Sequence, residues 1–164
     1  AISFWNSLRR LQNENRRPPR THRLRPGVVH LRRRCYCLDM QFEHFALNVS
    51  DKSRAEQWYR EHLSLSPVRS IPGNMSFLAD PTGRVILEIY QKSEADVLPY
   101  SDLHPLTLHV AFTVEDVEAE VKRLTEAGAA VVEPPHVVNG DTLAMLRDPF
   151  GLAIQLVHRK EPMT

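Results

Sequence analysis

Cysteine and aromatic residues are scarce in this sequence of 164 residues, and long apolar runs are missing. The chain has 2 Cys, and aromatic residues make up 7% of it. Two cysteines cannot form the disulfide framework of a small secreted scaffold. No segment approaches the run of about 18 apolar residues that a membrane-spanning helix needs, and 6 Gly with 12 Pro are too few for a collagen-like or low-complexity chain. The composition therefore predicts a soluble, cytoplasmic protein with one or two small domains.

Charge is divided unevenly along the chain, although the overall net charge is only +1. Residues 1–39 hold ten Arg against Glu14 and Asp39, a net charge of +8, whereas residues 40–164 have a net charge of −7. Basic runs broken by proline bury little apolar surface, so we interpret residues 1–39 as a disordered basic extension. A transit peptide or an arm for nucleic acid or membrane surfaces is the alternative. We expect the folded domain over residues 40–160.

The rest of the chain contains one unit that is used twice. Residues 44–51 (HFALNVSD) and 109–116 (HVAFTVED) share identical residues at four positions and start 65 residues apart. Residues 80–83 (DPTG) and 148–151 (DPFG) form a second matched pair, 68 residues apart. Two landmarks that recur in the same order indicate an internal repeat.

Hydrophobic periodicity predicts the element order βαβββ in each unit. In the first unit we expect a helix after Asp51 and strands over residues 42–49, 68–71, 75–79 and 85–90. In the second we expect a helix that ends at Gly128 and strands over residues 106–114, 130–133, 142–146 and 152–157. The sequence thus predicts modules over residues 40–91 and 106–159. Residues 92–105 form either a linker between them or a flap over a site.

These features resemble the vicinal oxygen chelate superfamily, which includes glyoxalases, epimerases, fosfomycin- and bleomycin-resistance proteins and extradiol dioxygenases. The resemblance rests on the two βαβββ modules, the His that opens each first strand, and the D-P-x-G turns before strands that end in LEI or IQL. It covers residues 40–160. It implies an α+β fold in which two βαβββ modules form a cupped, partly open mixed β-sheet barrel with the helices outside.

The resemblance also implies a metal site, because in this superfamily the first and last strands of both modules hold the ion. Carried over by position, the four ligands are His44, Glu88, His109 and Gln155. Glu88 is the one carboxylate among them and is therefore also the candidate catalytic base. Two imidazoles, a carboxylate and an amide suit a divalent ion such as Zn, Ni, Co, Mn or Fe.

Glu88 and Gln155 differ in their distance from the preceding turn. Gln155 is four residues past Gly151, as the acidic ligand of the superfamily is, whereas Glu88 is five residues past Gly83. Side chains alternate between the faces of a strand, so one extra residue would turn Glu88 to the opposite face. A β-bulge in this strand would restore the phase.

Three functions are compatible with these residues. The leading hypothesis is a metal-dependent lyase or isomerase of glyoxalase type, which chelates two neighbouring oxygens of a small substrate and abstracts a proton. The alternative is a non-catalytic protein that binds a small molecule in the cup, as antibiotic-resistance members do. A third is an Fe(II) extradiol-type dioxygenase, in which His44, His109 and Glu88 form the metal-binding face. The orientation of Glu88 toward the histidines discriminates between the enzyme and the binder.

The expected partners are a small-molecule substrate or ligand and a second copy of the chain. Members of the superfamily often dimerise, and two modules alone expose long sheet edges, which favours a homodimer. The net charge of −7 over residues 40–164 argues against nucleic acid and membrane as partners of the folded part.

Overall fold

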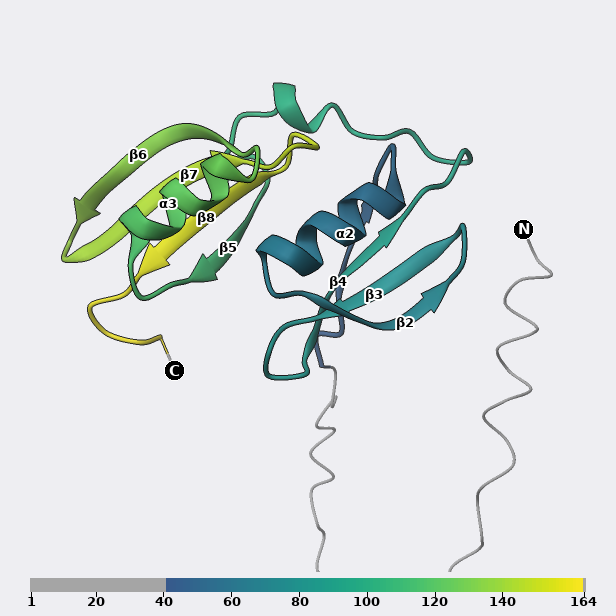
Figure 1. Ribbon diagram of the computed structural model, residues 1–164, viewed down its shortest axis with the longest axis horizontal. Coiled ribbons are helices and arrows are strands. Elements are labelled where there is room, and N and C mark those ends of the chain that lie inside the picture. Colours follow the sequence, from purple (N-terminus) through teal and green to yellow (C-terminus); the bar gives the residue numbers. More distant parts are fainter. Residues whose placement is uncertain (1–40, 164) are drawn as a thin grey trace, which may run out of the picture. The chain divides into compact units, whose positions relative to one another are not determined.

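The computed structural model describes residues 41–163, and these residues form two modules of the same construction (Figure 1). The first contains one helix, α2 (Lys52–His62), and four strands: β1 (Phe45–Asn48), β2 (Ser66–Ile71), β3 (Met75–Ala79) and β4 (Val85–Tyr90). The second contains α3 (Val117–Glu126) and the strands β5 (His109–Thr113), β6 (Ala130–Val138), β7 (Asp141–Arg147) and β8 (Ala153–His158). The predicted order βαβββ is confirmed in both modules. The predictions for residues 1–39 lie outside the described residues.

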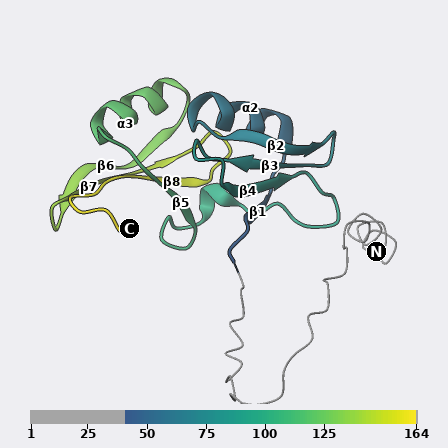
Figure 2. The same cartoon turned by 90° about the horizontal axis from the view of Figure 1, so that it is seen from below.

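Both sheets have the same topology. The strand order is β1-β4-β3-β2 in one sheet and β5-β8-β7-β6 in the other. In each sheet the first and last strands of the module run parallel, and the remaining neighbours are antiparallel. Figure 2 shows α2 and α3 on the same side of the two sheets. The α+β fold of two unclosed mixed sheets with outer helices agrees with the prediction.

Capping residues and apolar stripes explain where the helices form. Asp51 accepts a hydrogen bond from the Arg54 amide in α2, and Asp116 accepts one from the Ala119 amide in α3. Both are N-caps, which satisfy backbone donors that a helix leaves without partners. Gly128 follows α3 with φ +95, the left-handed conformation that glycine tolerates best. The expected helix start after Asp51 and helix end at Gly128 are therefore confirmed.

Two strands of the second module differ in length from the prediction. β5 begins only at His109, because the Thr107 amide donates to the His104 carbonyl in a turn that precedes it. β6 continues to Val138 through Pro134 and Pro135. A proline lacks the N–H that a central strand needs, but β6 lies at the edge of its sheet and tolerates the loss.

The two modules share one apolar core. Buried side chains of the first module, such as Leu78 and Ile89, belong to the same cluster as Leu146 and Ile154 of the second. Polar contacts join the modules as well, since the Trp58 indole N–H donates to the Ala127 carbonyl over 2.9 Å. The repeats therefore pack together, and contacts between them stabilise the fold.

The segment between the modules, residues 92–105, is tied to both sheets. The Asn48 side chain donates to the carbonyls of Lys92 and Ala95 and accepts from the Lys92 amide. Further along, the segment forms the short helix η1 (Tyr100–Asp102), and the Arg147 guanidinium donates to the carbonyls of Tyr100 and Leu103. Residues 92–105 are thus a fixed linker over most of their length.

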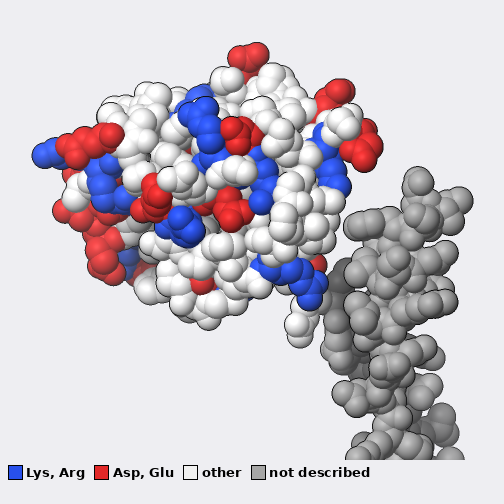
Figure 3. Space-filling model, turned by 45° about the vertical axis from the view of Figure 1, so that its right-hand side comes forward, with Lys and Arg blue, Asp and Glu red and all other residues white. Residues whose placement is uncertain are grey.

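Charged side chains of both signs are interspersed on the face of the molecule in Figure 3, with no continuous field of one sign. On helix α3, for example, Glu120 and Arg123 form an ion pair one turn apart. Among residues 41–163, no helix is both long and apolar enough to cross a membrane.

Candidate functional site

His44 and Glu88 lie side by side on the first sheet, on the face away from α2. The Nε2 atom of His44 is 3.1 Å from Oε2 of Glu88, and both side chains are largely shielded, with exposed fractions of 24% and 12%. The His44 ring also packs edge-on against Phe77, with 5.2 Å between the ring centroids. The first strand is shorter than the predicted range 42–49, so His44 lies directly before β1. His44 and Glu88 of β4 nevertheless bring an imidazole and a carboxylate together.

A β-bulge in β4 places Glu88 on this face. Leu78 of β3 pairs with Leu87, but its neighbour Ala79 pairs with Val85, so Ile86 has no partner in the ladder. The extra residue reverses the alternation and sets Glu88 opposite Ala46 of β1. The bulge that the spacing from Gly83 required is therefore present.

The strand pairing shows that Glu88 and Gln155 occupy equivalent places in the two modules. Gln155 lies opposite Ala111 of β5 and Met145 of β7, and this part of the β7–β8 ladder has no register shift. Glu88 lies opposite Ala46 of β1 and Phe77 of β3 in the same way. The bulge compensates for the one-residue difference in spacing between the modules.

His44 contacts a second carboxylate, which sequence reasoning missed. Its Nδ1 atom is 2.6 Å from Oε2 of Glu43. The Nδ1–Glu43 contact has hydrogen-bond geometry, whereas Nε2 and Glu88 approach each other to 3.1 Å. A carboxylate on one ring nitrogen is the usual support of a histidine that binds a metal through the other. The donor set therefore fits a divalent cation in kind.

In the second module, the Nδ1 atom of His109 also contacts a hydrogen-bond acceptor. Its Nδ1 atom is 3.0 Å from the Pro105 carbonyl oxygen, which can only accept a hydrogen bond. In the neutral ring this contact places the proton on Nδ1 and leaves the lone pair on Nε2 for a ligand.

The described chain does not bring all four predicted ligands together. Among residues 41–163, no three side chains of His, Cys, Asp or Glu lie close enough to hold one metal ion. His109 therefore does not join His44 and Glu88 within one chain. The structure assembles one half of the predicted set on the first sheet, and the complete set stays a prediction.

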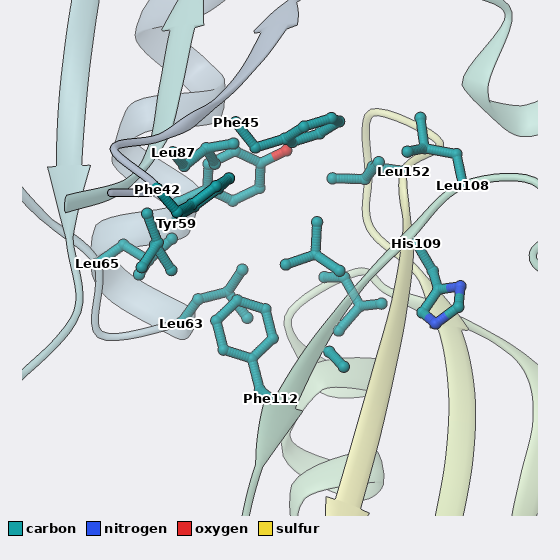
Figure 4. A pocket seen from close by; sticks show the side chains of 14 residues that line it. Phe42, Phe45, Tyr59, Leu63, Leu65, Leu87, Leu108, His109, Phe112 and Leu152 are labelled. Carbon is teal, nitrogen blue, oxygen red and sulfur yellow. The ribbon is translucent and has the colours of Figure 1, made fainter. Parts of the chain in front are cut away.

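An apolar cavity of about 300 Å³ lies between the two modules (Figure 4). Phe42, Phe45 and residues 108–112 contribute to its walls, and Tyr59 of α2 reaches it from the helix side. In Figure 4 the imidazole of His109 lies at one side, apart from the apolar group. Apolar residues on a first strand are also expected in a core, so they indicate such a cavity only weakly.

A second cavity, of about 560 Å³, lies beneath the linker. Asn48 and Tyr90 line it from the first sheet, and Asp96, Tyr100 and Leu103 line it from the linker. Ala46, which lies opposite Glu88, also lines it. The linker therefore forms one wall of this cavity, and a role of the segment as a flap over a site stays a prediction.

A buried hydrogen bond connects α2 with the second D-P-x-G turn. The Tyr59 hydroxyl donates to Oδ2 of Asp148 over 2.8 Å, while Oδ1 accepts from the amides of Phe150 and Leu152. Burial raises the pKa of Asp148 above its ordinary value, although the hydrogen bonds from Tyr59 and the backbone oppose this rise. Burial also raises the pKa of Tyr59, and the adjacent Asp148 adds to the effect. This pair connects the modules.

Comparison with known proteins identifies the class of the chain. Residues 41–156 match the family model of the Glyoxalase/Bleomycin resistance protein/Dioxygenase superfamily. The chain therefore belongs to this superfamily, in agreement with the resemblance seen in the sequence. No curated relative matches the sequence.

Solved structures support the same fold. A glyoxalase-related enzyme from Fulvimarina pelagi has a TM-score of 0.58 and 19% identity, over 73% of this chain and 88% of that one. A possible glyoxalase from Bacillus cereus has a TM-score of 0.55 and 23% identity, over 71% and 97%. TnmS3, an antibiotic-binding protein from Streptomyces sp. CB03234, has a TM-score of 0.55 and 25% identity, over 74% and 97%. At these identities the first two similarities show the fold alone.

Proposed function

We propose that the protein is a metal-dependent lyase or isomerase of glyoxalase type. Its substrate is a small molecule with two neighbouring oxygens and an acidic C–H bond. The observation that carries the proposal is the 3.1 Å contact between His44 Nε2 and Glu88 Oε2, with Glu43 on the other ring nitrogen. A surface glutamate has no need of the bulge at Ile86, whereas a ligand or base that must face His44 does.

The proposed ligands are His44 and Glu88 from a first module, with His109 and Gln155 from a second module that faces it. When bound, a divalent cation supplies Lewis-acid polarisation of the two substrate oxygens. The donors have a net charge of −1, which leaves most of the ion's charge available to the substrate. Glu43 contacts the His44 ring at Nδ1, and Phe77 packs against its edge, so both would support the ring orientation that a ligand needs.

Glu88 has two proposed tasks. One carboxylate oxygen faces His44, and the group as a whole is only 12% exposed. A shielded carboxylate close to the substrate is suited to accept the proton from the C–H bond and return it to a neighbouring atom. A divalent ion held by these residues would stabilise the negative charge of Glu88 while the group is deprotonated.

The proposed site requires a second copy of the chain. β1 and β5 each lie at the edge of their sheet, and on the outer side neither has a hydrogen-bonded neighbour among the described strands. Edge strands offer free backbone groups to another chain. A homodimer in which the first module of one protomer faces the second module of its partner would use these edges. It would also add His109 and Gln155 to the His44–Glu88 pair.

The second candidate function is a binding protein without catalysis. The cavity between the modules favours it, because the residues that line it are apolar apart from His109 and Tyr59. Such a cavity suits an apolar ligand that makes few polar contacts. The similarity to TnmS3, which binds an antibiotic, supports the same possibility.

Exchange of the substrate proton distinguishes the two functions. The full chain, loaded with divalent ions, is incubated in D₂O with hemithioacetals, 2-hydroxyketones and acyl thioesters, and deuterium at the carbon next to the carbonyl is followed by NMR. We expect exchange or turnover with one class and a loss of about 100-fold or more in E88Q, since the base is removed. E61Q, which changes an exposed glutamate at the end of α2, is the matched control. If E88Q exchanges protons as fast as wild type, Glu88 is not the base.

A further inference from the structure

We infer that Arg69 binds a second, anionic group of the substrate, a carboxylate or a phosphate, at a fixed distance from the His44–Glu88 pair. This inference rests on the proposed function and specifies its substrate class: small molecules that carry two neighbouring oxygens at one end and a negative charge at the other.

A row of directly paired residues crosses the whole first sheet. Arg69 of β2 pairs with Phe77 of β3, Phe77 pairs with Glu88 of β4, and Glu88 pairs with Ala46 of β1. Directly paired residues of neighbouring strands project from the same face. Arg69, Phe77 and Glu88 are therefore on the face that carries His44. Two strand spacings separate the Cα atoms of Arg69 and Glu88, which is roughly 10 Å.

A β-bulge in β2 brings Arg69 into this row. Pro67 pairs with Leu78 and Arg69 pairs with Phe77, so Val68 has no partner in the ladder. Without the extra residue the side chain of Arg69 would point to the opposite face. The first sheet thus has two bulges, one at Val68 and one at Ile86. Each redirects a charged residue toward the same face.

The surroundings of Arg69 leave its guanidinium accessible to a ligand. It lines a cavity of about 280 Å³ with Val68, Phe77, Val85 and Glu43. Among residues 41–163, no carboxylate forms an ion pair with its guanidinium. Glu43 is the other charged residue in the lining, and its carboxylate is bonded to His44. The guanidinium is thus an exposed cation beside an aromatic ring, with its hydrogen-bond donors available to a ligand.

The second module shows that the scaffold itself does not require an arginine here. At the equivalent place of the other sheet, Glu133 pairs with Met145, which pairs with Gln155. A register shift next to Glu133 marks the same bulge. The geometry is therefore common to both repeats, whereas the positive charge belongs to the first module alone. A guanidinium fork matches the two oxygens of a carboxylate or phosphate, so an anion is the ligand that fits.

The test compares substrates with and without the second charge on the full chain. Co²⁺ is titrated first, and its visible absorption reports binding at the proposed site. Isothermal titration of the Co²⁺ form then compares 2-hydroxyglutarate with 2-hydroxypentanoate, which has the same chain length but one carboxylate, and 3-phosphoglycerate with glycerate. The first pair tests a carboxylate and the second a phosphate. The variants are R69Q, R69K and, as the charge-matched control, R54Q on the exposed side of α2.

We expect wild type and R54Q to bind at least one probe with the second anionic group about tenfold to a hundredfold more tightly than its partner without that group. R69Q should lose this preference without a change in Co²⁺ affinity, and R69K should retain part of it. If Co²⁺ binds but the preference is missing in wild type or persists in R69Q, the inference fails while the proposed function stands.

If wild type does not bind Co²⁺, the proposed function fails. The same titrations without metal then test whether Arg69 binds an anionic group. Tighter binding of a probe with the second anionic group by wild type than by R69Q would support the anion site, and equal binding would overturn it. If R69Q binds all probes as wild type does but dissociates into monomers, Arg69 belongs to a contact between chains and the inference is wrong.

Discussion

Replacement of Tyr59 by Phe removes one hydroxyl group from the joint between the modules and leaves the apolar packing in place. Tyr59 is 1% exposed, and its hydroxyl is 2.8 Å from Oδ2 of Asp148. The Asp148 side chain keeps the backbone donors of Phe150 and Leu152 on Oδ1, so the loss is confined to Oδ2. A buried carboxylate oxygen without a partner costs about 1.5–3 kcal/mol of unfolding free energy. For a domain of this size that lowers the melting temperature by about 5–15 °C.

The loss should depend on pH with a defined sign. Burial raises the folded-state pKa of Asp148 above its unfolded value, so ionisation of this group opposes folding. Its contribution to stability is therefore most favourable below the unfolded pKa and decreases as the pH rises through the folded pKa. The Tyr59 hydrogen bond opposes the rise in pKa, so Y59F should raise the pKa further and lose more stability at pH 7 than at pH 4.

Urea unfolding of Y59F at several pH values, followed by circular dichroism, measures both effects. Y90F is the control, because the Tyr90 hydroxyl makes no hydrogen bond to residues 41–163. We expect a change of less than about 0.5 kcal/mol for Y90F. If Y59F also stays within this range, or if its loss does not decrease toward pH 4, the buried hydrogen bond does not have the role assigned to it.

Three further predictions follow from the fold and the site. N48A removes all three hydrogen bonds from the Asn48 side chain to the linker, so we expect a loss of about 2–4 kcal/mol and faster proteolysis within residues 92–97, seen by mass spectrometry. G151A should destabilise far more than G83A in thermal unfolding. Both glycines have positive φ, but only at Gly151 would a Cβ lie 2.7 Å from the Ser101 amide nitrogen, whereas nothing lies within 4 Å at Gly83. E43Q should weaken Co²⁺ binding by about tenfold to a hundredfold, since Glu43 supports the His44 ring, and an unchanged affinity would separate Glu43 from the site.

The repeat explains why so much of the fold could be predicted from the sequence. Residues 44–51 and 109–116 mark the start of each module, and the D-P-x-G turns at Gly83 and Gly151 mark the last hairpin of each. Local signals of this kind need no knowledge of the tertiary structure. The extent of β6 was harder to predict, because Pro134 and Pro135 normally interrupt a strand and only an edge position permits them.

The site depends on features that local patterns describe less well. The spacing of Glu88 from Gly83 showed that a bulge was needed, but the bulges at Ile86 and Val68 are properties of strand register, which the sequence does not display. The support of His44 by Glu43 depends on side-chain rotamers. The link between Tyr59 and Asp148 joins residues 89 positions apart, and no periodicity predicts such a contact.

The central claim is that His44 and Glu88 of one chain bind a metal ion together with His109 and Gln155 of another. Complementation between inactive variants tests it most directly. H44A and H109A are prepared separately as full chains, and each should bind far less Co²⁺ than wild type. The two are then mixed, unfolded and refolded together so that protomers exchange, and bound Co²⁺ is counted by mass spectrometry.

If the site forms between chains, a mixed dimer contains one site in which both modules are intact and one in which both are altered. Random assortment makes half of the dimers mixed, so about a quarter of the wild-type metal content should return on mixing. If the mixture binds no more Co²⁺ than the separate variants while wild type binds one ion per chain, each site is built within one chain. That result would contradict the account.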